Sequence, residues 1–371
     1  MSTCTLSSAK TRKTLAPSTL LRAAGAVLIV CSTSLPANAQ ISRAAAQATQ
    51  APQSFALTDP KDLTVTGGKA EAVEYQGRKA VRLTTESTEE VFAFLNSVQF
   101  QDGTIEADIA LKATTPPGVR MPGFIGIAFR TRPDTSHYDM FYLRPGNSRS
   151  ENQAMRNHSV QYVAAPGFDW YTLRRQWPWI YESWADLQPE RWAHVKIEVH
   201  GRNAKLYVDG SENPSLIVNG LRGEDLEGGI ALWGYAGEEA YFSNAKVTPA
   251  PAEAISNGGE ASGAWDVHFP SDDGDFKGSM NLQRSGNTVT GTWSGAFGQN
   301  QAVSGTWRNG YVELTFNGDW SPEKPGEKPG PMTATLAGWI DGDSAQGQMK
   351  VEGKADGQWT AARKTAAASG K

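Results

Sequence analysis

The chain has 371 residues, of which 39% are hydrophobic and 20% charged, and its net charge at pH 7 is −4. An acidic balance with dispersed basic residues argues against nucleic acid as a partner, because phosphate binding requires a basic face. The length is sufficient to bury a substantial core.

Residues 1–39 predict a secretory signal peptide. They contain four basic residues and no acidic one, then an apolar run at 23–30, and they end in Ala37-Asn38-Ala39. We expect cleavage near Ala39 and a periplasmic or secreted location. Removal leaves 31 basic against 39 acidic residues, a net charge of −8. We expect no membrane span, because no segment reaches the roughly 20 apolar residues that spanning needs.

Both cysteines, Cys4 and Cys31, lie in the segment that we expect to be removed. The exported protein would then contain no disulfide, and its core must stabilise it unaided. Lipid attachment at Cys31 is an alternative, which the bulky Val30 before it disfavours.

Composition divides the remaining chain into two domains. Residues 40–54 are rich in Ala and Gln and predict a disordered tether. A similar stretch at 249–262 predicts a linker between domains at 55–248 and 263–363, and residues 364–371 predict a disordered tail.

The domain at 55–248 is expected to be an antiparallel β-sandwich. Its short segments alternate apolar and polar residues, as in Val195, Ile197 and Val199, between Gly, Pro, Asn and Asp. About a dozen such strands without a long helical period are typical of two packed sheets.

The domain at 263–363 is expected to be an eight-stranded up-and-down barrel, because eight short strand patterns follow one another with hairpin spacing. A unit Val-x-Gly-x-Trp occurs at 289–293 and again at 303–307. We expect the tryptophans to fill the barrel interior rather than to bind a ligand.

Six segments of the first domain follow one another in a recognisable order. They are GTIEADI (103–109), GIAFR (126–130), YDMFYLRP (138–145), the run from Trp192 to Gly210, GGIALW (228–233) and AYFSNAKV (240–247). This order resembles the concanavalin A-like jelly roll, in particular laminin G-like modules and the 3-keto-disaccharide hydrolase domain. The second domain resembles small lipocalin-like barrels. The resemblance implies the all-β fold, which lectins, hydrolases, lyases and adhesion modules share.

The segment 167–184 is the densest in aromatic rings and predicts a ligand-facing loop. Indole rings offer flat platforms and guanidinium groups offer planar forks of donors, a combination that suits sugars. The alternative is that the rings close one end of the sandwich as core. The residues are Trp170, Tyr171, Arg174, Arg175, Trp177, Trp179, Tyr181 and Trp184.

Strand alternation predicts a groove floor on the outer face of one sheet. With Ile125, Ile127 and Phe129 in the core, Arg130 points outward, and the next strand sends Tyr142 and Arg144 outward. The alternative is that each arginine pairs with a surface carboxylate such as Asp134 or Glu151. Gln161, before the aromatic segment, adds an amide suited to hydroxyl groups.

Evidence for catalysis is sparse in the sequence. His158 is a weak candidate for a general base, and a structural role is the alternative. The resemblance implies a Glu-x-Asp-x-x-Glu strand in jelly-roll glucanases, but Leu111 stands at the final acidic position after Glu106 and Asp108.

No metal or cofactor is expected. The other four histidines lack the spacing of metal ligands, which argues against zinc. A structural calcium ion at 272–275 (Asp-Asp-Gly-Asp) is possible, with a hairpin turn as the alternative.

The sequence therefore predicts an exported carbohydrate-binding protein. The alternatives are a hydrolase or lyase acting on keto-disaccharides or uronic glycans, and a cell-envelope adhesion or scaffold module; a protein partner stays open. The expected sugar contacts are Arg130, Tyr142, Arg144, Gln161, Trp170, Arg174, Trp177 and Trp179.

Overall fold

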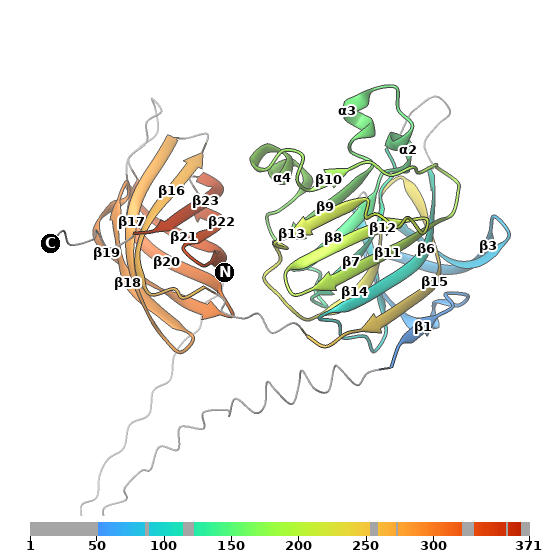
Figure 1. Cartoon of the computed structure of the whole chain (residues 1–371), viewed down its shortest axis with the longest axis horizontal. Coiled ribbons are helices and arrows are strands. Elements are labelled where there is room, and N and C mark those ends of the chain that lie inside the picture. Colours follow the sequence, from blue (N-terminus) through green and yellow to red (C-terminus); the bar gives the residue numbers. More distant parts are fainter. Residues whose placement is uncertain are drawn as a thin grey trace, which may run out of the picture. The chain divides into compact units, whose positions relative to one another are not determined.

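The computed structural model describes residues 51–85, 89–113, 122–252, 259–271, 274–320, 330–353 and 355–364 (Figure 1). The signal peptide expected at 1–39 lies outside the described residues, as do most of the tether and most of the tail.

Within the described residues, the strands form two antiparallel sheets of a sandwich and one closed barrel, which confirms the predicted all-β class. The larger sheet has eight strands. In spatial order they are β13 (Leu216–Asn219), β12 (Asn203–Val208), β11 (Ala193–His200), β6 (Gly103–Ala113), β15 (Glu238–Pro249), β4 (Arg78–Thr85) and β3 (Gly68–Tyr75), with β1 (Gln53–Phe55) also paired to β15. Strand β1 thus begins two residues before the expected domain start at 55.

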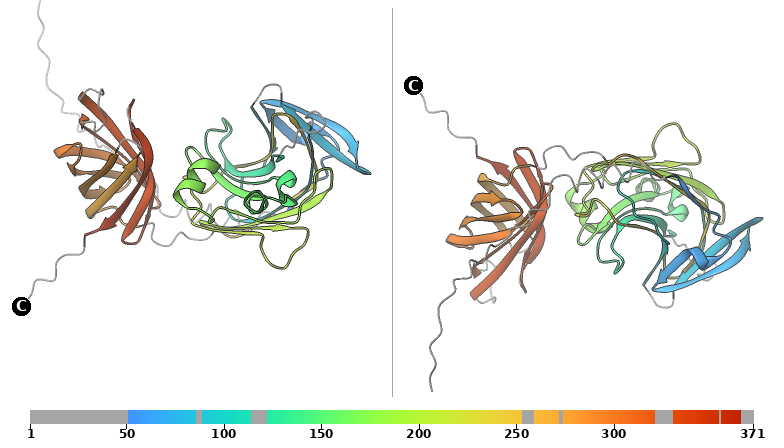
Figure 2. Two further views of the ribbon diagram at one scale, coloured as in Figure 1. Left: turned by 90° about the horizontal axis from the view of Figure 1, so that it is seen from above. Right: turned by 90° about the horizontal axis from the view of Figure 1, so that it is seen from below.

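The smaller sheet has seven strands, and both sheets are curved (Figure 2). In spatial order its strands are β10 (Glu182–Ser183), β9 (Val160–Ala165), β8 (Tyr138–Leu143), β7 (Ile125–Thr131), β14 (Gly229–Tyr235), β5 (Glu90–Leu95) and β2 (Leu63–Thr66). The short helices are η1 (Pro60–Asp62), α2 (Pro145–Ser148), α3 (Gln153–Arg156) and α4 (Trp170–Gln176).

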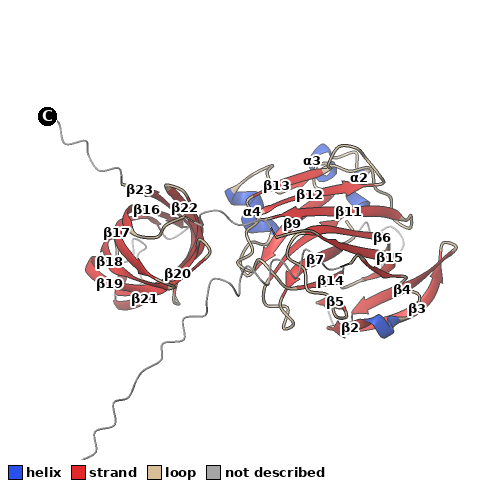
Figure 3. Ribbon diagram, turned by 60° about the horizontal axis from the view of Figure 1, so that its bottom comes forward, coloured by secondary structure: helices blue, strands red, loops and turns tan. Residues whose placement is uncertain are grey.

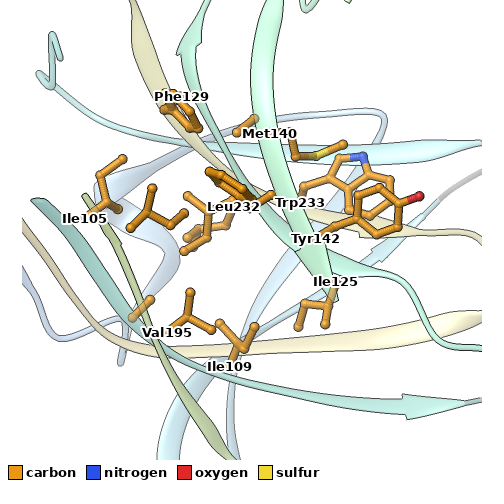
Figure 4. Packing of buried hydrophobic residues seen from close by; sticks show 14 of the residues in the cluster. Ile105, Ile109, Ile125, Phe129, Met140, Tyr142, Val195, Leu232 and Trp233 are labelled. Atoms are coloured by element: carbon orange, nitrogen blue, oxygen red, sulfur yellow. The ribbon is translucent and has the colours of Figure 1, made fainter. Parts of the chain in front are cut away.

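The sandwich core lies between the two sheets. Ile109 and Val195 from the eight-stranded sheet and Ile125 and Leu232 from the seven-stranded sheet are at most 3% exposed, and Figure 4 shows their packing. Burying each such side chain contributes about 1.5–3 kcal/mol to folding. Because alternate residues of a strand point to opposite faces, the same strands also present a second set of side chains on the outer face.

The barrel closes through pairing of its first and last strands (Figure 3). The glycines of the repeated Val-x-Gly-x-Trp unit allow close approach of neighbouring strands: a Cβ at Gly291 would lie 2.1 Å from Asn281 O, and one at Gly305 would lie 1.9 Å from Glu313 O. The strands are β16 (Gly263–Ser271), β17 (Gly274–Ser285), β18 (Thr288–Gly295), β19 (Gly298–Arg308), β20 (Tyr311–Trp320), β21 (Gly330–Asp341), β22 (Ser344–Val351) and β23 (Ala355–Arg363).

Candidate functional site

The outer face of the seven-stranded sheet carries a row of side chains from five neighbouring strands. Their register brings together residues more than 100 positions apart in the sequence, over about 19 Å at the usual strand spacing. The residues that pair in turn are Trp233 on β14, Gly126 on β7, Tyr142 on β8, Gln161 on β9 and Glu182 on β10.

Gly126 allows two aromatic rings to meet across β7. A Cβ at this position would lie 2.6 Å from the Cβ of Tyr142. Without that atom, the rings of Tyr142 and Trp233 approach to 5.4 Å between centroids, and Figure 4 shows them side by side. The glycine in the sequence GIAFR is therefore required by the close packing of the neighbouring strand.

A pocket of about 420 Å³ borders this row at Trp233 and Tyr142. Two of its lining residues carry carboxyl groups, Glu90 on β5 and Asp169, which caps α4 by accepting a hydrogen bond from the backbone N–H of Thr172 (2.6 Å). Most of the remaining lining is aromatic. The aromatic residues are Phe124, Tyr138, Tyr142, Trp170, Trp233 and Tyr235.

A cluster of charged and titratable groups adjoins the pocket; we call Arg144, His158, Arg174 and Glu182 the basic corner. Arg174 holds Glu182 with both Nε and Nη2, at 2.9 and 2.7 Å, and His158 Nδ1 lies 2.8 Å from Glu182 Oε2. Burial lowers the pKa of His158, as do the two arginines, while Glu182 opposes the shift. We therefore expect a neutral imidazole at pH 7.

Arg144 is buried, with 5% of the residue exposed. Its Nη2 donates to the Tyr142 hydroxyl at 2.5 Å and its Nη1 to the His158 carbonyl at 3.3 Å, and its guanidinium lies 5.0 Å from the Tyr142 ring centroid and 5.8 Å from that of Phe124. Burial lowers the pKa of Arg144. Its hydrogen-bond partners are both neutral oxygens.

Burial raises the pKa of two carboxyl groups near the aromatic wall. Glu90 lines the pocket, and desolvation is the largest cause of its raised pKa. Glu238 accepts a hydrogen bond from Phe124 N at 2.6 Å, and burial raises its pKa to about 8. Both carboxyl groups are thus less readily ionised than in water.

The expected ligand-facing loop at 167–184 contains a helix, which corrects the sequence interpretation. Asp169 caps α4, whose residues Trp170–Gln176 include two arginines in the last turn, a favourable position for cations. The helix places the ring of Trp170 on the pocket wall, with the Arg174 guanidinium 4.9 Å from its centroid.

Arg130 does not lie on the groove floor, so that prediction is wrong. The pairing of β7 with β14 shifts register after Ala128, and Arg130 has φ = +52°, the geometry of a bulge that reverses strand alternation. Arg130 is 1% exposed, and its guanidinium pairs with Asp102 at 2.9 Å and donates to the Gly201 carbonyl. The bulge gives it a structural position in the fold.

Two other expected sugar contacts are also not available to a ligand in the pocket. Trp177 is half-buried and packs against the core, with the rings of Phe168 and Tyr181 within 6.4 Å and 6.1 Å of its own. Gln161 lies on the predicted face but is fully buried, and its Nε2 donates to the Tyr162 and Tyr181 carbonyls.

Trp179 is 64% exposed and stacks on His158 with 5.9 Å between centroids. Of the expected contacts, the structure therefore gathers Tyr142 and Trp170 in the pocket, Arg144 and Arg174 in the adjoining basic corner, and Trp179 on the surface beside that corner.

Sequence reasoning missed several pocket residues. Trp233 and Tyr235 alternate with core residues in GIALWGY, so the parity argument used for β7 and β8 applies to β14 and places both outward. Glu182 carried no recognisable spacing, because its partners His158 and Arg174 become neighbours only through the β9–β10 pairing and the turn of α4.

Among the described residues, no group of three or more His, Cys, Asp or Glu side chains is arranged to hold a metal ion. Asp272 and Asp273, the centre of the possible calcium site, lie outside the described residues. Asp275 pairs with His268 and with Lys277, and the His268 contact is the largest cause of its lowered pKa.

No family model matches this sequence, and comparison with curated proteins finds no match. The chain is similar to many solved structures, among them the following three. The carbohydrate binding module CBM66 from Bacillus subtilis is 18% identical, with a TM-score of 0.36, over 50% of this chain and 96% of the module.

The second is a Bacillus subtilis protein of unknown function with a galectin-like fold (13% identity, TM-score 0.38, 55% and 98% covered). The third is the calcium-bound exoplasmic/lumenal domain of VIP36 (12% identity, TM-score 0.40, 54% and 92% covered).

Among the described residues, none of the helices has the length and hydrophobicity that crossing a bilayer requires.

Proposed function

We propose that the pocket on the seven-stranded sheet binds a carbohydrate. The observation that carries the proposal is the combination of an aromatic floor and wall with polar groups at the margin. Aromatic faces pack on the C–H faces of sugar rings, and carboxyl, imidazole and guanidinium groups hydrogen-bond with hydroxyls. The volume of about 420 Å³ is within the range of small-molecule sites.

The exposed aromatic side chains support a ligand longer than the pocket. Trp170 and Trp179 are 45% and 64% exposed, and Trp184, two residues after Glu182, is 48% exposed. Exposed rings gathered in one segment are typical of a binding surface. An oligosaccharide that fills the pocket would extend along this segment.

Binding is tested by calorimetric titration of the whole exported chain with a panel of neutral and acidic oligosaccharides. We expect Trp233→Ala to weaken the affinity found for the wild type, since Trp233 lines the pocket. Trp192→Ala is the matched control, because that half-buried ring contacts Tyr75 outside the pocket. Absence of binding across the panel, or equal losses in both variants, would contradict the proposal.

Cleavage of the bound glycan is a second candidate function, which the contact of His158 with Glu182 favours. A carboxylate 2.8 Å from Nδ1 orients an imidazole, and burial keeps the pKa of His158 low, so that the ring can accept a proton. The nearby arginines would stabilise developing negative charge. Chromatography of glycans incubated with the wild type and His158→Ala tests it: products must form with the wild type and disappear in the variant.

A further inference from the structure

The basic corner carries an excess of positive charge beside the aromatic pocket. Arg174 and Glu182 neutralise each other through a bidentate contact, and the pKa of His158 is lowered by its burial. Arg144 is left over: among the described residues, no carboxylate lies within ion-pair distance of its guanidinium. The corner therefore holds one uncompensated cation at neutral pH.

A buried guanidinium without a counterion is costly, because transfer from water is only partly offset by bonds to neutral acceptors. The two acceptors of Arg144 are the Tyr142 hydroxyl and the His158 carbonyl. The contrast with Arg130 is direct, since that equally buried arginine has the Asp102 carboxylate at 2.9 Å. An anionic group of a ligand would be the counterion of Arg144, as the Asp102 carboxylate is the counterion of Arg130.

Arg144 is placed to reach a pocket ligand. It follows Tyr142 by two positions, at the end of β8, and its guanidinium packs over the rings of Tyr142 and Phe124, which both line the pocket. Glu90 lies on β5, which is separated from β8 by β14 and β7, a distance of about 14 Å at three strand spacings. The Arg144 guanidinium and the Glu90 carboxyl group therefore lie toward opposite ends of the pocket.

We propose that the natural ligand is an acidic glycan whose uronate carboxylate contacts Arg144. This inference rests on the proposed function and names its ligand class. The guanidinium holds the carboxylate at the β8 end, and the rings of Tyr142 and Trp233 contact the sugar face. The Glu90 end of the pocket has no cation in its described lining to bind the carboxylate in the reversed orientation.

The test compares uronic oligosaccharides with their carboxyl-reduced counterparts, which have the same linkage and stereochemistry but no charge. Probes are oligomers of galacturonate, mannuronate and glucuronate, titrated calorimetrically into the full exported chain. We expect at least one acid to bind ten times more tightly than its reduced form. Equal affinity of each pair overturns the inference but leaves carbohydrate binding intact, whereas binding of no saccharide removes both.

Variants assign the preference to Arg144. Arg144→Gln should reduce the ratio between the affinities for the acid and for its reduced form to about one. Arg149→Gln is the matched control, since Arg149 lies on the surface and already has a counterion in Asp186. Retention of the preference in Arg144→Gln overturns the inference. A sulfated oligosaccharide without carboxyl groups that binds as tightly as the acid overturns the assignment to a carboxylate.

Discussion

The two domains use the same side chains differently. Four barrel tryptophans, Trp265, Trp293, Trp320 and Trp359, are at most 1% exposed, whereas Trp170 of the sandwich is 45% exposed. Buried polar and charged groups differ as well: within the described residues, those of the sandwich include arginines, aspartates and glutamates, and the barrel contributes a single glutamine.

This difference indicates that the sandwich, rather than the barrel, carries the candidate binding site. The barrel interior is filled by stacked rings, such as Trp293 and Phe316 at 4.7 Å, and its tryptophans stabilise the fold. The sandwich instead places rings on an outer face beside buried charges. An aromatic-rich sequence is therefore informative about binding only when its rings project from a sheet rather than fill it.

The largest expected effect is on barrel stability. Trp293→Ala should lower the free energy of unfolding by about 3–5 kcal/mol, because it leaves a cavity among packed rings. Trp179→Ala, at an exposed position, should change it by less than about 1 kcal/mol. Urea denaturation of both variants measures the contrast, and similar losses would show that the two domains do not differ in this way.

A second comparison separates two buried arginines of the sandwich. Arg130→Met should destabilise the protein by about 3 kcal/mol, since it removes the cation paired with the fully buried carboxylate of Asp102. Arg144→Gln should cost much less, because no carboxylate depends on Arg144 within the described residues. The denaturant midpoints of the two variants measure the difference in stability. A larger loss of stability for Arg144→Gln than for Arg130→Met would refute the distinction between the two arginines.

A third prediction concerns binding. Trp233→Ala should weaken glycan affinity by about 1–3 kcal/mol, the range for a large aromatic contact at an interface. Trp177→Ala should lower the melting temperature and leave affinity unchanged, because Trp177 packs on Phe168 and Tyr181. Calorimetric titration and thermal unfolding of both variants are the measurements. If Trp177→Ala weakened the affinity and Trp233→Ala did not, the binding surface would lie beside Trp177 rather than in the pocket.

Strand periodicity was sufficient to predict the fold, since apolar alternation and hairpin spacing are local properties of the chain. It also predicted correctly that Tyr142 and Arg144 share a face. Strand periodicity gave the wrong face for Arg130, because a bulge with positive φ adds a residue to β7. No residue type in GIAFR indicates that bulge.

The helix α4 was missed because its seven residues are too few for a helical period. The corner formed by His158, Arg174 and Glu182 was also beyond sequence reasoning, because its members meet through strand pairing and a helical turn rather than through spacing. Long-range pairing thus determines the charged part of the site, while local alternation determines its aromatic part.

The smallest expected effect is a pH dependence that arises in the sandwich. The pKa of Glu238 is raised by burial from 4.5 to about 8, so between these values the folded state binds more protons than the unfolded state. The unfolding free energy therefore falls as pH rises, by about 1 kcal/mol per pH unit from this group. Glu238→Gln keeps the size of the side chain, removes the titration and should flatten the curve.

The measurement is urea unfolding of the wild type and Glu238→Gln between pH 6.5 and 8. His158, with its lowered pKa, contributes in the opposite sense at the lower end of this range, and equally in both proteins. A residual slope from Glu90 has the same sign, since its pKa is also raised by burial. Because the described barrel side chains include no buried carboxylate, the barrel should add no comparable slope. Parallel curves for the two proteins would show that Glu238 is ionised in the folded state, and that the sandwich does not hold a neutral acid behind its aromatic wall.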